Sequence, residues 1–595
     1  MFPLLFALIS LAADPLVAPN ASVWVTDAMK ASVSLRDSTA RSPKALLTLA
    51  EKTDWQQTGN YDECVALYKQ LAAVSPLAKL IDIGETPAGR RMYVLVASKD
   101  KAFTPEAARK TGKAILLLQN GIHPGENGGK DASVMLLRDI LVAKKHLGLL
   151  DNTIILSIPV FNIDGHENIS PYNRVNEQGP REMGFRVTAQ RYNLNRDYMK
   201  ADAPEMRHWL RMWNQWQPDI MIDNHVTDGS DLQHDITIAV EDSLSVHPAV
   251  ADWVKQKWVP RIWQAMDEQG HVTGWYVGGP TRPGGNFVRE PSAPRYSTGY
   301  AATRNRAALL VETHSLKPFR VRAWCHYDVM VETLRVLGDQ AAALRKATAA
   351  ADADRPSRVP VEFAAAQTGV PYQVRALESE TYTGSVSGGP VTRYLAKPRE
   401  ISMTLIRDAV AKTEITVPKG YYIPRAWRSV AELLEAHGVK VETLRQPLTA
   451  EFEVTRFRNV KFPAQPFEGR FQPSFDVAFA TEKRTLPAGT YYVTTATANV
   501  KLIANLLEAQ APDSVVKWGL MSGIFEMKEY VSPYIMEPLA QKMLAADPQL
   551  KAEFEAELQR DEAFAKNPAA RLRWVYQRSP FFEPDKDVYP IVRLP

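Results

Sequence analysis

The sequence predicts an α/β fold in which a mixed, largely parallel sheet is flanked by helices, followed by a C-terminal α+β accessory region. Short apolar runs alternate with amphipathic helical stretches from residue 62 to about residue 312, the order of elements found in α/β layer folds. Clusters of polar residues directly follow these apolar runs, where open α/β sheets bind ligands. Beyond residue 357 the chain becomes richer in β-branched residues, Pro and Gly, which indicates a different architecture.

The strands are predicted where short apolar runs are bounded by Gly, Pro or polar residues. They cover residues 81–84, 89–97, 114–119, 153–160, 219–223 and 307–311. The helices are predicted from apolar residues at three- and four-residue intervals, as at Val65, Tyr68 and Leu71. They cover residues 62–74, 129–145 and 203–216, with a closing helix and linker at 339–357. In the C-terminal half, strands are expected at 372–376, 414–417 and 490–494, and helices at 426–437, 498–508 and 533–565.

A chain of 595 residues is too long for one ordinary core, so several domains are expected. We divide it into a signal peptide at 1–20, an α/β domain at 21–350 and an accessory α+β region at 351–595. Residues 1–13 form an apolar run that ends on small residues, as signal peptides do, although no Lys or Arg precedes it. This predicts an exported protein, periplasmic or secreted. No later segment approaches the ~20 apolar residues of a membrane span.

The composition excludes several classes of protein. Hydrophobic residues make up 45% and charged residues 23% of the chain, as in globular proteins. The net charge of +4 gives no support for nucleic acid or a polyanionic membrane surface as partner. Cys64 and Cys325 are the two cysteines, too few for a disulfide framework or a cysteine-ligated zinc site. One bridge between them and two separate buried thiols are both compatible with the sequence.

Residues 115–126 give the strongest indication of a metal site. An apolar strand runs into a Pro-Gly turn that carries His123 and Glu126, three positions apart. Catalytic zinc takes three protein ligands from His and Asp/Glu and keeps a fourth position for water. His-x-x-Glu alone occurs often by chance, so the chain must supply a third ligand and a general base elsewhere.

His225 is the best third ligand, because it follows the strand at 219–223 and opens a polar loop. Three further histidines are weaker alternatives, namely His166, His314 and His326. His234 is expected at the rim of the site. The remaining histidines are expected on polar helix faces or in loops, where unpaired surface His is common.

Three other positions carry residue types suited to catalysis or binding. Glu312 ends the strand at 307–311, and a carboxylate at a buried strand end is either paired or has a raised pKa suited to a base. Asn195 and Arg196 offer an amide beside a guanidinium, donors that can grip a carboxylate. Arg186 lies nine residues before Asn195. Arginines near acidic loops also form surface ion pairs that contribute little, so a structural role stays open for them.

In this order the motifs resemble those of the zinc carboxypeptidase family, the carboxypeptidase A-like metallocarboxypeptidases. The family pattern is His-x-x-Glu after a strand, Asn-x-Asp-Gly, an Arg upstream of Asp-Leu-Asn-Arg, a strand-ending His and a strand-ending Glu. The corresponding segments here are His123-Pro-Gly-Glu126, Asn162-Ile-Asp-Gly165, Arg186 with Asn193-Leu-Asn-Arg196, His225 and Glu312. The resemblance covers about residues 50–345 and leaves the C-terminal half unexplained.

The resemblance implies a zinc-dependent carboxypeptidase with one Zn²⁺ per chain, held by His123, Glu126 and His225. It implies that Glu312 is the general base, which takes a proton from the attacking water and passes it to the leaving amine. Arg186 would polarise the scissile carbonyl and stabilise the developing oxyanion.

The resemblance also implies how a peptide substrate is held. Asn195 and Arg196 would bind its terminal carboxylate. Arg174 is an alternative to Arg186 and is counted among the substrate-binding residues. Tyr300 or Tyr296 would be the tyrosine that closes over the substrate.

One departure from the family pattern concerns the first histidine. The family Asp before Leu-Asn-Arg is Asn193 here. In the family that Asp orients the first zinc histidine, a role that favours a carboxylate. Asn can still accept a hydrogen bond from the imidazole, but without charge, which predicts weaker zinc binding.

Three functions are compatible with these residues. The first is an exported carboxypeptidase that removes C-terminal residues from peptides, favoured by Asn195 and Arg196. The second is an amidase or endopeptidase that acts on peptidoglycan stem peptides with the same site. The third is a catalytically inactive binding protein, which would have no need of Glu312.

Overall fold

The computed structural model describes residues 24–36, 43–228, 230–276 and 282–595, in two compact units. The first comprises Met1–Gly420, Trp427–Glu442 and Val493–Ser514, as far as these are described. The second comprises Tyr421–Ala426, Thr443–Tyr492 and Val515–Pro595. The signal peptide predicted at 1–20 lies outside the described residues.

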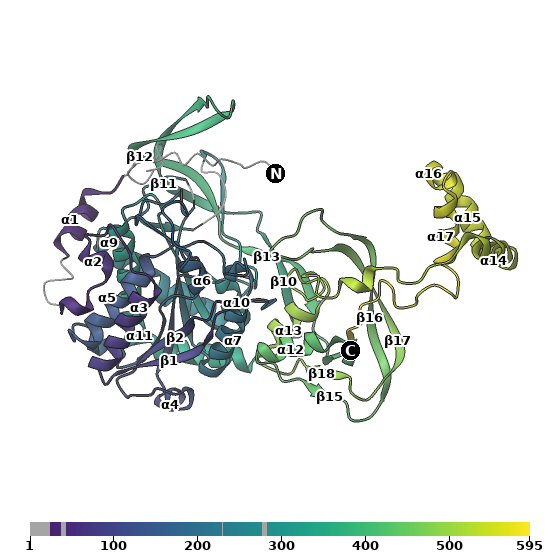
Figure 1. Ribbon diagram of the computed structural model, residues 1–595, viewed down its shortest axis with the longest axis horizontal. Coiled ribbons are helices and arrows are strands. Elements are labelled where there is room, and N and C mark those ends of the chain that lie inside the picture. The colour runs from purple at the N-terminus through teal and green to yellow at the C-terminus, as the bar shows by residue number, and fades with distance from the viewer. Residues whose placement is uncertain (1–23, 37–42, 229, 277–281) are drawn as a thin grey trace, which may run out of the picture. The chain divides into compact units, whose positions relative to one another are not determined.

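The first unit is built on an eight-stranded mixed sheet with helices on both sides (Figure 1). In spatial order its strands are β1 (Ala78–Glu85), β2 (Arg91–Ala97), β4 (Thr153–Ile158), β3 (Ala114–Asn120), β5 (Ile220–Val226), β9 (Ala307–Thr313), β6 (Ile236–Val240) and β7 (Thr273–Trp275). The four central strands β4, β3, β5 and β9 are parallel to one another. Antiparallel pairs join β1 to β2, β2 to β4 and β6 to β9. The predicted fold class is therefore confirmed.

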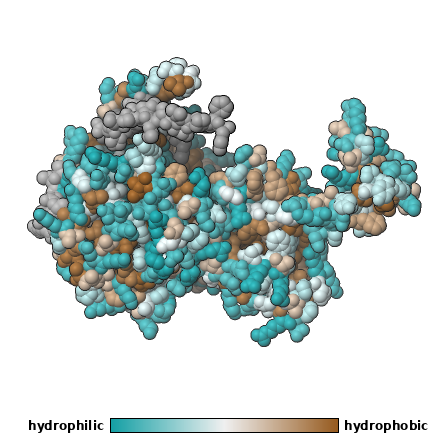
Figure 2. Space-filling model, in the orientation of Figure 1, coloured by the Kyte–Doolittle hydropathy of each residue, from teal (hydrophilic) through white to brown (hydrophobic). Residues whose placement is uncertain are grey.

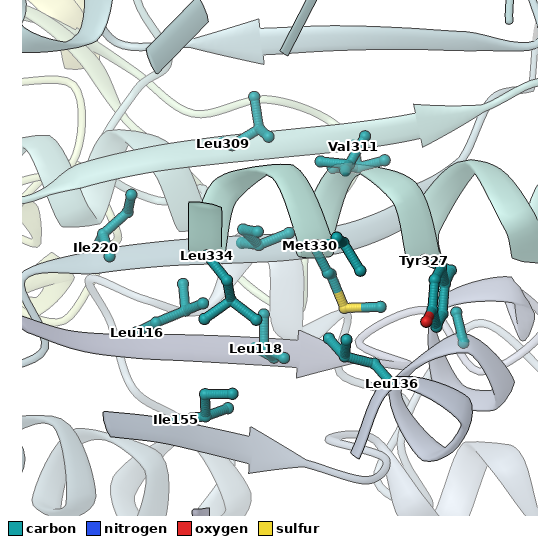
Figure 3. Packing of buried hydrophobic residues seen from close by; sticks show 14 of the residues in the cluster. Leu116, Leu118, Leu136, Ile155, Ile220, Leu309, Val311, Tyr327, Met330 and Leu334 are labelled. Atoms are coloured by element: carbon teal, nitrogen blue, oxygen red, sulfur yellow. The ribbon is translucent and has the colours of Figure 1, made fainter. Parts of the chain in front are cut away.

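The central strands are continuous apolar runs because both of their faces are covered. Every residue of β3, β4 and β5 is buried. On one face, helices α5 (Gly128–Leu141) and α11 (Phe319–Ala353) contribute to the core, and Figure 3 shows Met330 and Leu334 of α11 beside Leu116 and Leu118 of β3. Burying one such side chain contributes about 1.5–3 kcal/mol to folding.

A second packed group in the first unit is aromatic. Trp209 of α7 (Pro204–Trp216) stacks on Trp213, with ring centroids 4.9 Å apart, and meets Tyr300 of α10 (Ser297–Thr303) at 5.9 Å. The hydroxyl of Tyr300 lies 3.0 Å from Nδ1 of His437, which follows α12 (Arg428–Ala436). A segment from the C-terminal half therefore completes this cluster.

The first unit contains further short elements. Its other helices are α1 (Asp27–Leu35), α2 (Leu49–Lys52), α3 (Tyr61–Val74), α4 (Pro105–Thr111), α6 (Ile163–His166), α8 (Pro248–Trp253), α9 (Val259–Glu268) and α13 (Val500–Leu507). Its other strands are β8 (Asn286–Val288), β10 (Arg358–Ala365), β11 (Val370–Thr383), β12 (Pro390–Ile406) and β13 (Ala409–Thr416). The hairpin β11–β12 is joined to the short strand β8 through a parallel pairing with β12.

The second unit contains a six-stranded sheet and a group of helices. The sheet order is β15 (Glu442–Thr443), β18 (Tyr491–Thr494), β14 (Gly420–Ile423), β19 (Val592–Leu594), β16 (Leu448–Lys461) and β17 (Ser474–Leu486). The helices are α14 (Pro533–Ala546), α15 (Pro548–Arg560), α16 (Glu562–Ala565) and α17 (Pro568–Tyr576). The predicted α and β elements of the C-terminal half are thus present.

Several boundaries differ from the sequence prediction, and the single helix predicted at 533–565 is divided into α14, α15 and α16. The closing helix α11 begins at Phe319, twenty residues before the predicted start. The sequence pattern did not indicate its first half, because this half buries the charged Arg322, which pairs with Glu177 at 2.9 Å, and so lacks an amphipathic pattern. Helix α5 ends at Leu141, and β5 continues to Val226. The last difference places His225 inside the strand.

The polarity of the surface and the state of the two cysteines agree with what the composition predicts for a globular protein without a disulfide framework. On the face drawn in Figure 2, hydrophilic and hydrophobic residues alternate over short distances. Within the described part of the chain, no helix is long and apolar enough to cross a membrane. Cys64 and Cys325 are both buried and unpaired. The disulfide that the sequence left open does not form.

Candidate active site

The three predicted metal ligands meet at the carboxyl ends of β3 and β5. After β3 the chain turns at Gly121, whose φ of +63° suits glycine, and reaches His123 and Glu126. Strands β3 and β5 are parallel, and Asn120 lies opposite Asn224. His225, the next residue of β5, is therefore brought to the same edge of the sheet.

The donor atoms of these residues converge. Nδ1 of His123 lies 3.0 Å from Oε1 of Glu126, and Nδ1 of His225 lies 3.0 Å from Oε2. The two Nδ1 atoms are 3.2 Å apart. All three side chains are buried, and this is the one group of potential ligands among the described residues in which one donor atom from each lies within 4.8 Å of the others.

The outer nitrogens of both imidazoles are held by acceptors. Nε2 of His123 lies 3.2 Å from Oδ1 of Asn193, and Nε2 of His225 lies 2.7 Å from Oδ2 of Asp223. A protonated Nε2 satisfies each acceptor, which leaves both Nδ1 atoms as lone-pair donors facing the Glu126 carboxylate. Such an arrangement is stable around a cation, and two imidazoles with one carboxylate are a known catalytic zinc set. The residues therefore fit zinc.

The titration behaviour of two of the ligands suits metal binding. Burial lowers the pKa of His123 to about 4, so its imidazole is neutral at pH 7. For Glu126, burial favours the neutral acid, but His123 and Arg174 outweigh it and hold the pKa well below the ordinary value. For His225, burial lowers the pKa, but the carboxylates of Asp223 and Glu126 raise it well above the ordinary value. A metal at Nδ1 therefore competes with a proton there.

The metal centre opens into a cleft of about 710 Å³. Glu312 lies in this cleft, on β9 directly opposite His225 in the parallel register. Its side chain is buried, and Oε2 has no hydrogen-bond partner among the described residues. Burial raises the pKa of Glu312 to about 8. A carboxylate in this state is suited to accept a proton.

The two candidate arginines occupy different places. Arg186 lines the cleft, is one-third exposed, and has Nη1 3.7 Å from Oε1 of Glu126. Arg174 does not line the cleft; its buried guanidinium donates to Oε1 of Glu126 at 2.9 Å and pairs with Glu177. The guanidinium of Arg174 therefore supports a metal-ligand candidate, while Arg186 is the arginine that lines the cleft.

Asn195 and Arg196 both line the cleft. Oδ1 of Asn195 accepts a hydrogen bond from the backbone N–H of Ser297 at 3.2 Å, which leaves its amide N–H groups as donors. The guanidinium of Arg196 stacks on the ring of Tyr296 at 4.4 Å. Tyr296 thus lies at the cleft beside the predicted carboxylate site.

Tyr300 does not reach the cleft, and the expectation that it closes over substrate is wrong. It is fully buried, because α10 turns it into the aromatic cluster where it meets His437. Tyr276, which the sequence did not indicate, lines the cleft and is 40% exposed. The nearby charge of Glu312 is the main cause that raises the pKa of Tyr276 above its ordinary value.

The alternative histidines are engaged elsewhere. Nε2 of His166 contacts Lys130 at 3.1 Å, Nε2 of His314 accepts from the N–H of Leu232, and Nδ1 of His326 contacts Asn224. His234 is buried rather than at a rim. None of these is close enough to join His123, Glu126 and His225 in the one ligand group found in the described part of the chain.

Comparison with known proteins gives one family. Residues 64–234 match the family described as zinc carboxypeptidase. The chain is 22% identical to carboxypeptidase 2 of Trichophyton tonsurans over 446 residues, which is 72% of this chain and 77% of that protein. It is 28% identical over 104 residues to carboxypeptidase 2 of Trichophyton rubrum, covering 18% of this chain and 19% of that protein.

The solved structures to which this chain is similar include carboxypeptidases. The carboxypeptidase A of Helicoverpa armigera is 16% identical, with a TM-score of 0.36, over 53% of this chain and 78% of that chain. A metallo-carboxypeptidase from Burkholderia cenocepacia is 15% identical, with a TM-score of 0.35, over 46% of this chain and 68% of that chain. The converging ligands and the match over residues 64–234 together indicate a zinc carboxypeptidase domain in this part of the chain.

Proposed function

We propose that this protein is a zinc metallocarboxypeptidase that hydrolyses the C-terminal peptide bond of its substrate, with Glu312 as general base. One observation carries the proposal: the cleft that holds Glu312, Arg186, Asn195 and Arg196 is also lined by His123 and Glu126 of the metal centre. A binding protein would have no use for a buried carboxylate with a raised pKa beside a metal centre.

The proposed roles follow from position. Arg196 and the amide of Asn195 bind the terminal carboxylate of the peptide, which leaves the last peptide bond toward Arg186 and Glu312. His123, Glu126 and His225 would hold the zinc, which would supply a Lewis acid that polarises a carbonyl and makes water more acidic.

Glu312 accepts a proton from the water whose oxygen bonds to the carbonyl carbon. Arg186 donates hydrogen bonds to the carbonyl oxygen as negative charge develops there. Glu312 then returns the proton to the amide nitrogen as the C–N bond breaks. The products are a free amino acid and a peptide shortened by one residue.

The test is a screen of peptides with free, amidated and D-terminal ends, together with muropeptides, alongside a zinc assay. We expect cleavage of free C-termini, loss of activity after chelation and recovery with zinc. Activity that survives thorough chelation contradicts the metal role. Preferential cleavage of muropeptides supports the amidase or endopeptidase alternative instead. Export, as a periplasmic or secreted protein, is part of this proposal and is tested by fractionation.

A further inference from the structure

Glu241 is a buried carboxylate in the active-site cleft that the proposed reaction does not use. It follows β6 by one residue and lines the same cleft as Glu312. Its side chain is almost fully enclosed, with 3% of the residue exposed. A carboxylate in such a position is costly unless something satisfies it.

The partners of Glu241 are neutral. Oε2 accepts from the hydroxyl of Ser245 at 2.7 Å, and Oε1 accepts from the N–H of Ser292 at 3.0 Å and the hydroxyl of Thr298 at 3.3 Å. Across the described ranges, no Lys, Arg or His forms an ion pair with it. Burial accordingly raises the pKa of Glu241.

The neighbouring acid provides a contrast. Asp242 pairs with Nη2 of Arg289 at 3.2 Å, and that guanidinium lies 3.7 Å from the ring centre of Trp275. Asp242 is therefore satisfied by a cation of the protein itself. Glu241 has unused acceptor capacity, because one carboxylate accepts about four hydrogen bonds.

Strand register places Glu241 at a useful distance from the reacting centre. Thr237 of β6 lies opposite Glu312, and Ala239 lies opposite Leu310. Glu241 follows Val240, the last residue of this strand, and lines the cleft itself. It lies four positions after Thr237, a span of about 13 Å in extended chain. An extended lysine or arginine with its backbone and terminal hydrogen bond covers a comparable length.

Glu241 is also connected to the proposed carboxylate site. Asn195 accepts from the N–H of Ser297, while the next residue, Thr298, donates to Glu241. Asn195 and Glu241 therefore contact consecutive residues in the first turn of α10. Val240 and Leu310 also line the cleft, and their apolar side chains offer surface along which a methylene chain can lie.

We propose that Glu241 is the specificity-determining residue of the cleft and that the protein removes C-terminal arginine or lysine. The inference rests on the proposed carboxypeptidase function. The cationic head of the terminal side chain forms charge-assisted hydrogen bonds with the Glu241 carboxylate, which no group of the described protein does. Arg407 also lines the cleft and can attract an acidic side chain, so a preference for acidic C-terminal residues is the competing outcome. Because Arg407 is exposed, its charge is better solvated than that of the buried Glu241.

The test compares peptides that are identical except for the last residue, namely arginine, its uncharged isostere citrulline, norleucine or glutamate. For the zinc-loaded protein we expect kcat/KM for arginine to exceed that for citrulline by about 10- to 100-fold, the range for a hydrogen bond to a charged group. Glu241→Gln should reduce this ratio to about threefold or less, through a fall in kcat/KM for the arginine peptide. Asp242→Asn, the matched loss of an adjacent negative charge, should retain the arginine preference.

Several outcomes overturn the inference. They are equal rates on arginine and citrulline, a preference for glutamate, or a Glu241→Gln variant that loses both substrates equally. Because the comparison of the unsubstituted protein needs no variant, a folding defect in Glu241→Gln leaves the test intact. If no free C-terminus is cleaved, the proposed function fails. In that case, calorimetry compares the affinities of the arginine and citrulline peptides for the Glu312→Gln variant. Tighter binding of the arginine peptide still supports the role of Glu241, and equal affinities contradict it.

Discussion

His225 and Glu312 stand opposite each other on the adjacent parallel strands β5 and β9. One is a candidate metal ligand and the other the candidate base, so the sheet itself fixes their separation. Neither position depends on a loop. A parallel pair at the centre of the sheet is among the most rigid supports that a fold offers for groups that act together.

Replacing Glu312 by Gln should remove the proton acceptor and leave the metal centre intact. We expect kcat to fall by about 10²-fold or more, since general base catalysis contributes on that scale, with one zinc per chain retained. Steady-state kinetics and metal analysis measure both. Glu290→Gln changes the same charge at an exposed position of the same cleft and should keep its turnover. Equal losses in both variants contradict the role of Glu312.

Asn193→Asp should tighten zinc binding. The side chain accepts from the outer nitrogen of His123, and a carboxylate there makes that imidazole a stronger donor to the metal. Changes of this kind alter affinity by about 10- to 100-fold, which competition with a chelator measures. Asn193→Ala should shift the affinity in the opposite direction. Unchanged affinity in Asn193→Asp would falsify the idea that this hydrogen bond tunes the metal.

Arg196→Ala should raise KM for peptides with a free C-terminus by about 10-fold or more, because a charge-assisted hydrogen bond is lost. Amidated peptides serve as the internal control, since they carry no terminal charge for the guanidinium to bind. If free and amidated peptides are affected alike, Arg196 does not hold the terminal carboxylate. In that case the stacking on Tyr296 accounts for its position.

Glu205 should make folding stability depend on pH. It is buried in α7, neither carboxylate oxygen has a hydrogen-bond partner among the described residues, and burial raises its pKa to about 7. The protonated acid is favoured in the folded state, so its contribution is complete below pH ~4 and is lost as the pH rises through ~7. Glu205→Gln should therefore be more stable than the parent at pH 8, by up to about 3 kcal/mol, and similar at pH 4.

Urea unfolding of the two proteins between pH 4 and pH 8 measures this difference. Glu106→Gln, an exposed position in α4, is the matched control and should follow the parent at every pH. A Glu205→Gln curve that runs parallel to the parent curve shows that the carboxyl is ionised in the folded protein.

The candidate metal site was predictable because its ligands lie in or just beyond the last residues of apolar strands. His123 and Glu126 come directly after β3, and His225 and Glu312 lie in the last residues of β5 and β9. Parallel strands bring such ends to one edge, so local pattern was enough to indicate which residues meet.

The rest of the cleft depended on contacts that no local pattern reports. Tyr276 and Glu241 follow the short strands β7 and β6, whose neighbours are set by sheet topology. Tyr300 was misplaced because its burial depends on His437, 137 residues away. His437 itself has the polar sequence surroundings of a surface histidine, yet it is fully buried.

The bond between Tyr300 and His437 has a practical consequence for anyone who shortens this chain. Two arginines that precede residue 350 also contact residues beyond it. Arg295 pairs with Asp513 at 2.8 Å, and Arg304 donates a hydrogen bond to the backbone oxygen of His437. A protein cut at residue 350 would expose an aromatic cluster and leave two arginines without these acceptors. Residues 427–442 and 493–514, far beyond the family-like segment, therefore belong to the same compact unit as the candidate site and have to be retained when the protein is studied.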